Sequence, residues 1–245
     1  ARLRNSTLVK NPATGGIIPG VEDRASLEGD TFDIGYTLGA LYEYSDQTRF
    51  GIGYRSQVKH KLKGDIKFEG LMLPANQDIS ARITTPANLT IGAYHDINDK
   101  WSVMAEFGRT YWSSFDTLDI YGENNGKMST TEERWKDTTF YAIGASYQYN
   151  DQWKFRVGFA VDQSAVGQEY RTPRIPDSDR LWYSSGIEYK YNDDWTFNLG
   201  YTYIRADKGK VKLLGYHDGD NARGSLQADY ENDIHILGFG ASYNF

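Results

Sequence analysis

Four charged side chains of mixed sign each follow directly on an apolar or aromatic residue. They are Arg55, Glu106, Arg156 and Glu188. If these segments are strands, the charges lie on the face opposite to the apolar side chains. A base on that face can bind the carboxylate of a ligand. The same bases can instead neutralise the two glutamates, because charges removed from bulk water need partners. We favour this structural interpretation and keep the ligand-binding one open.

Apolar residues interrupt two polar connections, near residues 10–24 and 70–78. They are Ile17 and Ile18 in the first, and Leu71, Met72 and Leu73 in the second. Exposed apolar patches usually mark binding surfaces, and a methionine can repack around varied ligands. We predict capture of a hydrophobic ligand here. The alternative is that these residues pack against the rim of the domain.

The sequence contains no convincing motif for catalysis, cofactor binding or metal binding. The four histidines have no recognisable spacing to a serine motif, and no Gly-x-Ser-x-Gly occurs. The segment 218–224 is only superficially like a calcium loop, since its glycine and terminal glutamate are out of place. Phosphate-loop and dinucleotide fingerprints are absent. We therefore expect no enzyme, no cofactor and no bound metal.

Composition narrows the classes of protein. The 245 residues contain no cysteine, which excludes a disulfide scaffold and a cysteine-ligated zinc module. The formal charge of −6 gives no general attraction to nucleic acid. Aromatic residues make up 15%, although the mean hydropathy is only −0.64. No apolar run is long enough for a membrane helix, whereas alternating membrane strands hide their hydrophobicity from such averages.

A period of two decides the fold class. Apolar and aromatic residues alternate with small or polar ones along most of the chain, for example in segments 32–44, 153–162, 195–203 and 237–245. Tyrosine and tryptophan bracket the apolar face, which points to a bilayer interface. We predict an all-β protein, a transmembrane antiparallel β-barrel of the outer-membrane type. The alternative is a large soluble antiparallel protein with ordinary hairpins.

Short and long connections alternate. Short polar links occur at 45–47, 98–100, 150–152 and 192–194, and an aromatic residue follows each almost at once. Longer polar connections lie near 10–24, 70–78, 123–130, 165–179 and 208–224. Short periplasmic turns and long outer loops are typical of outer-membrane barrels. We count about ten strands, the first (about 1–8) being weak, and the alternating final strand ends on an aromatic residue.

The chain resembles a known family, the FadL/OmpP1/TodX outer-membrane transporters of long-chain fatty acids and other hydrophobic compounds. The residues that carry the resemblance are segments 50–59, 62–64, 110–115, 135–137 and 171–186, including Ile175-Pro176-Asp177-Ser178-Asp179-Arg180. The resemblance extends from about residue 31 to 245. It implies a fourteen-stranded barrel with an N-terminal hatch, and a capture groove formed by outer loops that correspond to 10–24 and 70–78.

The resemblance places Ala1 in the middle of the fifth family strand. The signal, the hatch and the first four strands are then absent, and residues 1–245 form a single β-barrel domain. The chain is then either a fragment or a smaller closed barrel. An open ten-stranded sheet would leave two unpaired edges in hydrocarbon, which the bilayer does not tolerate.

Three classes of function remain. We favour passive transport of long-chain fatty acids or other hydrophobic molecules across the bacterial outer membrane, with capture at the apolar outer loops and passage through the lumen. A general porin for small polar solutes is the alternative, but it gives no reason for Leu71-Met72-Leu73. An outer-membrane enzyme or adhesin has no supporting motif. The expected partners are outer-membrane lipids and a hydrophobic ligand, with no nucleic acid, and the barrel is expected to be monomeric.

Overall fold

The computed structural model describes residues 2–8, 24–69, 76–122, 126–213 and 225–244. Within this part the protein is built almost wholly of strands. The strands are β1 (Arg2–Leu8), β2 (Arg24–Asp30), β3 (Thr37–Ser45), β4 (Thr48–Arg55), β5 (Val58–Glu69), β6 (Gln77–Thr85), β7 (Asn88–Asp96), β8 (Trp101–Thr110), β9 (Thr117–Tyr121), β10 (Lys127–Glu132), β11 (Thr138–Gln148), β12 (Trp153–Asp162), β13 (Arg180–Lys190), β14 (Trp195–Ala206), β15 (Gly209–Leu213), β16 (Leu226–Tyr230) and β17 (Asp233–Tyr243). One short 3₁₀ turn, η1 (Trp112–Ser114), follows β8.

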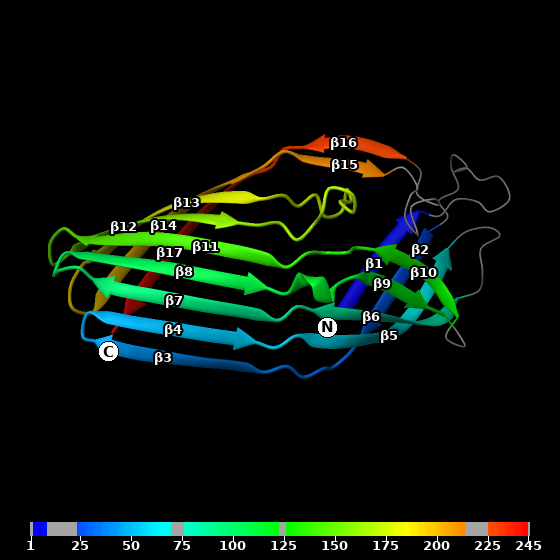
Figure 1. Ribbon diagram of the computed structural model, residues 1–245, viewed down its shortest axis with the longest axis horizontal. Coiled ribbons are helices and arrows are strands. Elements are labelled where there is room, and N and C mark those ends of the chain that lie inside the picture. The colour runs from blue at the N-terminus through cyan, green and yellow to red at the C-terminus, as the bar shows by residue number, and fades with distance from the viewer. Residues whose placement is uncertain (1, 9–23, 70–75, 123–125, 214–224, 245) are drawn as a thin grey trace.

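Antiparallel neighbours form three sheets. The largest has nine strands in the order β17-β14-β13-β12-β11-β8-β7-β4-β3, and its strands run side by side along the long axis of the molecule (Figure 1). A six-stranded sheet, β1-β2-β5-β6-β9-β10, continues from the end of these strands that lies away from the short turns. The third sheet consists of β15 and β16. The breaks between β4 and β5 and between β6 and β7 are only two residues long. β4 with β5 and β6 with β7 therefore form two long strands that pair with each other along both halves. Counted in this way, strands that follow one another in sequence are neighbours, which is the meander of an outer-membrane barrel.

The nine-stranded sheet has one apolar and one mixed face. In β12 the odd positions are the more exposed, for example Val157 at 62% and Phe159 at 37%, whereas Ala160 is 5% exposed. Cross-strand partners continue the pattern, since Phe159 lies opposite Ile143 and Tyr183. Polar pairs lie on the other, even-numbered face. This is the alternation that the sequence predicts for lipid-facing and lumen-facing positions.

The four predicted short turns are present and share one device. Asn98, Asn150 and Asn192 each accept hydrogen bonds from two following backbone N–H groups at 2.7–3.1 Å, and Ser45 does the same at 3.1–3.3 Å. These are Asx-turns and an ST-turn, in which a side-chain oxygen takes the place of a backbone carbonyl. The tryptophan after each asparagine packs on a tyrosine of the neighbouring strand, with ring centroids 4.4–5.0 Å apart. The turns and the aromatic brackets thus form one repeated unit.

The long connections are shorter than the sequence suggested. Residues 127–130 lie in β10 and residues 209–213 in β15, where the sequence analysis expected loop. Their polar alternation hid the strand signal. The weak first strand is real, because β1 pairs with β2 along its whole length. No helix in the described ranges is long and apolar enough to cross a membrane.

The six-stranded sheet curls around a small apolar core. Leu62, Ile66 and Ala81 are each less than 10% exposed. A small cavity on the same side is lined by further apolar residues, Leu27, Ile79, Leu118 and Ile120. This core holds the outer ends of the strands together.

Candidate functional site

The predicted charges Arg156 and Glu188 form an ion pair across β12 and β13. Arg156 also donates from Nη1 to Oδ1 of Asn198 on β14, at 3.2 Å. Glycines flank the pair on the same face, since Gly186 lies opposite both Arg156 and Gly200. The guanidinium is therefore already satisfied by protein groups, as the structural interpretation of these charges expects.

Arg55 and Glu106 are not joined to this pair. Arg55 ends β4 and lies opposite Thr37 and Asn88, and Glu106 lies between Gly92 and Ala142 in mid-sheet. Neither makes an ion pair within the described residues. Glu106 and Arg156 nevertheless line one cavity of about 600 Å³ together with Arg49, whereas Arg55 is not among its lining residues.

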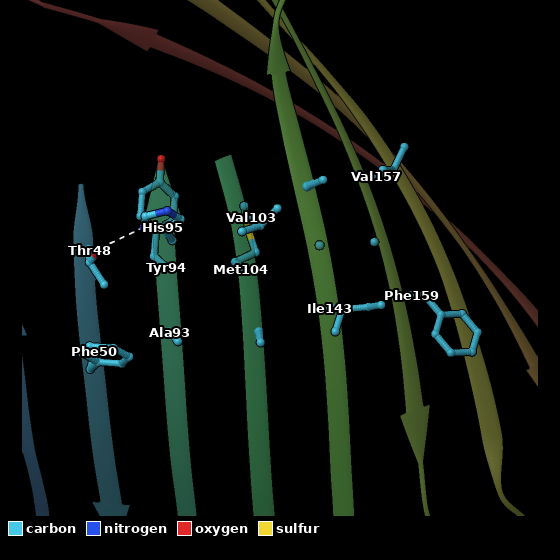
Figure 2. A pocket seen from close by; sticks show the side chains of 14 residues that line it. Thr48, Phe50, Ala93, Tyr94, His95, Val103, Met104, Ile143, Val157 and Phe159 are labelled. Atoms are coloured by element: carbon cyan, nitrogen blue, oxygen red, sulfur yellow. Dashed lines mark hydrogen bonds between the residues drawn. The ribbon is translucent and has the colours of Figure 1, made fainter. Parts of the chain in front are cut away.

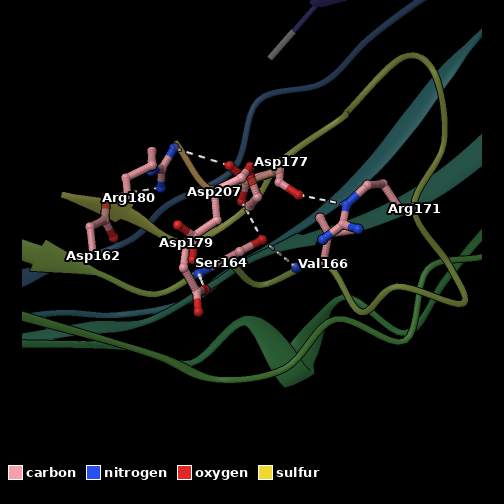
Figure 3. Close-up of polar contacts among 9 residues, drawn as sticks. Asp162, Ser164, Val166, Arg171, Asp177, Asp179, Arg180 and Asp207 are labelled. Atoms are coloured by element: carbon pink, nitrogen blue, oxygen red, sulfur yellow. Dashed lines mark hydrogen bonds and ion pairs between the residues drawn. The ribbon is translucent and has the colours of Figure 1, made fainter. Parts of the chain in front are cut away.

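A denser polar cluster, which the sequence analysis did not single out as a site, lies at the outer ends of β12 and β13. Arg180 bridges Asp162 (2.8 Å) and Asp177 (3.1 Å), as Figure 3 shows. All three side chains are less than one-third exposed. Asp162 and Arg180 are cross-strand partners on the face that also carries Arg156. The ion pair therefore joins the outer ends of β12 and β13 on the lumen-side face.

The segment between β12 and β13 is folded back and fixed by this cluster. Ser164 donates its backbone N–H to Asp179 (2.7 Å) and its hydroxyl to Asp177 (2.8 Å). Arg171, only 8% exposed, donates to the carbonyl oxygens of Asp177 (2.7 Å) and Lys210 (3.1 Å). The motif Ile175-Pro176-Asp177-Ser178-Asp179-Arg180 is thus a structural lock that ties a long connection to three strands.

Beneath this lock lies a cavity of about 610 Å³. Its walls combine apolar and aromatic side chains with a larger number of polar and charged ones. They include Trp112, Trp135, Ala165, Ile175, Pro176, Ile234, Asp162, Arg174 and Arg180. A volume of about 300–1,000 Å³ is usual for small-molecule sites, and the mixed lining suits an amphipathic molecule better than a purely apolar one. Arg174 is exposed and makes no ion pair within the described residues, so it is the free cation of this cavity.

The aromatic wall is held by an aspartate. Trp135 packs edge-on against Trp112 and Phe115, with centroids 4.8 and 5.0 Å apart. Asp137 accepts the backbone N–H of Ser113 (3.0 Å) and contacts Arg109 Nη2 (3.4 Å). The hydrogen bonding from Ser113, followed by the charge of Arg109, lowers the pKa of Asp137 below its usual value. Arg109 itself is bound by Asp137 and Thr139.

A second cavity, of about 690 Å³, lies on the apolar face (Figure 2). Alanines 93, 105 and 145 leave space between the larger side chains of Phe50, Val103, Ile143, Val157 and Phe159. Its polar end carries Thr48 Oγ1 hydrogen-bonded to His95 Nδ1 at 2.8 Å. Because this groove lies on the face of the lipid-facing alternation, an acyl chain of the bilayer can fill it, and it is separate from the lumen-side cavity.

The predicted capture residues Ile17, Ile18, Leu71, Met72 and Leu73 lie outside the described residues. The cavity under the lock was missed because its walls come from β8, β11, β12, β13, β14 and β17 together with the connections between strands. Its one sequence signal was the segment 175–180, which was used for the resemblance alone. No group of three or more potential metal-ligating side chains occurs in the part of the chain that the structure covers.

Comparison with known proteins places the chain in a family. Residues 3–245 match the family model described as outer membrane protein transport protein (OMPP1/FadL/TodX). A long-chain fatty acid transport protein of Escherichia coli is 30% identical over 247 residues, which cover 95% of this chain and 54% of that protein. The chain thus spans about half the length of this curated relative.

Solved structures agree on the fold. The crystal structure of a Pseudomonas aeruginosa FadL homologue has 24% identity and a TM-score of 0.86, covering 99% of this chain and 61% of its own. The toluene transporter TodX of P. putida has 21% identity and a TM-score of 0.59, covering 98% of this chain and 53% of its own. These likenesses support an outer-membrane barrel with the strand order described above. The chain therefore belongs to the OMPP1/FadL/TodX family of outer-membrane transport proteins.

Proposed function

We propose that this protein moves long-chain fatty acids or other hydrophobic molecules passively across the outer membrane. The observation that carries the proposal is the cavity beneath the segment 163–179, at the outer end of the lumen-side face, where Trp112, Trp135, Ile175 and Ile234 lie among polar and charged groups. It supplies a place for a hydrophobic molecule inside the strand wall. Family membership supports the same function.

In this proposal the ligand is first captured at the outer connections, by Leu71, Met72 and Leu73 together with Ile17 and Ile18. It then passes the cavity and enters the lumen. Residues 1–245 act as a single monomeric barrel domain. Passage needs no catalytic group, because a hydrophobe moves from water to apolar walls with favourable free energy.

The lumenal bases Arg55 and Arg156 play a smaller part. Arg156 is bound to Glu188 and Asn198, so a ligand carboxylate would have to displace both. A partly exposed pair of this kind contributes about 1 kcal/mol at most. Burial of three apolar side chains against an acyl chain contributes a few kcal/mol at about 25 cal/mol per Å².

The test compares variants of the whole protein in outer-membrane vesicles with a fluorescent long-chain fatty acid. We expect the triple change Leu71→Ser, Met72→Ser and Leu73→Ser to weaken capture more than Arg55→Gln or Arg156→Gln does. Circular dichroism should show equal strand content. If the triple variant binds the probe like its parent while an arginine variant loses it, the lumenal base is the recognition element.

A general porin is the alternative function, and no relative described above favours it. Single-channel conductance separates the two. An aqueous porin shows steady ion conductance that is independent of hydrophobic ligand. A hydrophobe transporter shows saturable ligand binding and little conductance.

A further inference from the structure

A bulge turns the lysines of β5 to the outside of the protein. Thr37 lies opposite Arg55, and Asp30 lies opposite Lys63, so residues 31–36 face residues 56–62, which are one residue more. An extra residue in one strand is a β-bulge, and it reverses the faces of the strand beyond it. Odd-numbered residues that face the lumen in β4 are therefore followed by odd-numbered residues that face outward in β5.

Two contacts fix which side chains point inward. His60 Nδ1 lies 2.9 Å from Oδ2 of Asp33, and Gly35 lies directly against Val58. Side chains alternate along a strand, so Phe32 and Ile34 point the opposite way from Asp33. Lys59 and Lys61, the neighbours of His60, point to that same outer side.

The outer side is strongly apolar on one strand. Phe32 and Ile34 are both exposed, and they lead into β3, the strand at one edge of the nine-stranded sheet. Tyr36 follows on the same face and packs near Tyr54, with ring centroids 6.2 Å apart. Such a tyrosine pair is typical of the membrane interface.

The same side carries three adjacent cations on the neighbouring strands, and the acids Asp30 and Asp119 lie on this side as well. Lys61 of β5 lies directly opposite Arg82 of β6, and Lys59 is the next outward residue of β5. None of the three makes an ion pair with a described residue. The acid opposite Arg82, Asp119, is taken by Lys127 (3.2 Å) and Thr130 (2.8 Å). Like charges directly opposite each other are destabilising unless an anion lies between them.

The height of this surface can be placed in the membrane. The short turn at Ser45 lies at the periplasmic end, and Tyr36 is nine residues away along the strand. At about 3.4 Å per residue and a tilt of about 40°, this rises roughly 23 Å, close to the apolar band of about 25 Å. Phe32, Ile34, Lys59, Lys61 and Arg82 therefore lie just beyond the apolar band, at the outer leaflet.

We propose that Phe32, Ile34, Lys59, Lys61 and Arg82 form a binding surface for lipopolysaccharide, the phosphorylated and multiply acylated glycolipid of the outer leaflet. Its phosphates receive hydrogen bonds from the three cations, and an acyl chain packs on Phe32 and Ile34. Ordinary phospholipid lacks the paired phosphates that three adjacent cations fit. The proposal rests on the outer-membrane location and not on the proposed transport function.

The experiment uses the whole protein purified in detergent, with bound lipid measured by native mass spectrometry. The probes are bisphosphorylated lipid A, dephosphorylated lipid A, and inorganic phosphate as competitor. We expect the triple variant Lys59→Gln, Lys61→Gln, Arg82→Gln to bind bisphosphorylated lipid A about tenfold more weakly, since each cation near an anionic surface contributes. Its binding of dephosphorylated lipid A should equal that of the parent.

A matched triple variant carries the same charge change elsewhere. Lys100→Gln, Lys190→Gln and Lys208→Gln alter exposed lysines in a short turn, at the end of β13 and in the connection after β14, and should leave lipid A binding unchanged. Millimolar inorganic phosphate should not displace the lipid, which distinguishes a lipid site from a free-phosphate site. Equal lipid A affinity in parent and basic-patch variant, or an equal loss in the matched variant, overturns the proposal.

The apolar half is tested separately. Phe32→Ser with Ile34→Ser should weaken both forms of lipid A, because both carry acyl chains. Hydrophobe uptake should persist in all of these variants, because none of the changed residues lines the lumen-side cavity. Loss of lipid A binding with normal hydrophobe uptake supports the lipid-binding surface and leaves the transport proposal untouched. Normal lipid A binding in the parent without hydrophobe uptake contradicts the transport proposal and leaves the lipid-binding surface untouched.

Discussion

At the scale of single residues, the decisive feature is whether a charge already has a partner. Arg156 is bound by Glu188 and Asn198, and Arg180 by Asp162 and Asp177. These arginines hold strands together. Arg174, in contrast, lines the outer cavity without an ion pair among the described residues. A ligand carboxylate will therefore find Arg174 at lower cost than Arg156.

The coupling of Arg156 and Glu188 can be measured. We expect Arg156→Gln and Glu188→Gln each to lower the free energy of unfolding by about 1 kcal/mol, and the double variant to lose less than the sum. Reversible urea unfolding in lipid vesicles gives the four values. Strict additivity would show that the pair contributes no coupling energy.

Asp137 makes the aromatic wall sensitive to acid. Its folded-state pKa is lowered, chiefly by hydrogen bonding from Ser113, so its stabilisation is complete above the ordinary value of 3.8 and is lost as the pH falls through the lower folded-state value. We expect the emission of Trp112 and Trp135 to change in this acid window, and Asp137→Asn to abolish the transition. Asp99→Asn, in a short turn at the other end, should leave it unchanged.

At the scale of elements, asparagine turns and interfacial tryptophans repeat as a unit. Asn150 Oδ1 accepts from the N–H groups of Gln152 and Trp153 at 3.0 and 2.9 Å, which fixes the turn between β11 and β12. Trp153 then packs on Tyr189 of the next strand. The turn thus sets both the strand register and the depth of the aromatic ring.

Removing the acceptor should weaken one turn. We expect Asn150→Ala to cost about 1 kcal/mol of unfolding free energy, because two backbone donors lose their partner. Asp151→Ala, the next residue of the same turn, should cost less than half as much. Equal losses would indicate that the asparagine contributes only through its place in the turn.

The lock between β12 and β13 carries a further prediction for the cavity. Ile175 and Ile234 are 39% and 44% exposed and line the space on either side. Changing both to serine should weaken binding of a hydrophobic probe severalfold while thermal stability changes little. Tryptophan quenching by a brominated fatty acid, next to Trp112 and Trp135, provides the measurement.

At the scale of the whole molecule, the two faces of the nine-stranded sheet meet different solvents. Leu199 is 46% exposed on the apolar face, and Asn198 lies on the lumen side beside Arg156 and Glu188. A charge on the first must enter hydrocarbon, whereas a charge on the second stays near water and a carboxylate. The fold therefore makes adjacent residues differ sharply in tolerance.

We expect Leu199→Lys to cost about 2–4 kcal/mol in a bilayer and Asn198→Lys much less. Unfolding in vesicles of phosphatidylcholine measures both. Equal costs would contradict the assignment of the faces.

Much of this architecture follows from the sequence by itself. A period of two, interfacial aromatics and four short turns are local signals, and they predicted the all-β barrel class, the turn positions and the placement of Arg156 and Glu188 on one face. The same local reading failed at β10 and β15, where polar alternation looks like loop.

The tertiary structure alone decided the rest. The outer cavity needs residues from six strands and four connections. The lock needs Asp162, Asp177 and Arg180 to meet across 18 residues of chain. The outward direction of Lys59 and Lys61 depends on a one-residue bulge that composition does not reveal. Sequence periodicity gives the two faces of a strand, but only hydrogen-bonded register between strands determines which residues share a face, and therefore which of them form a site.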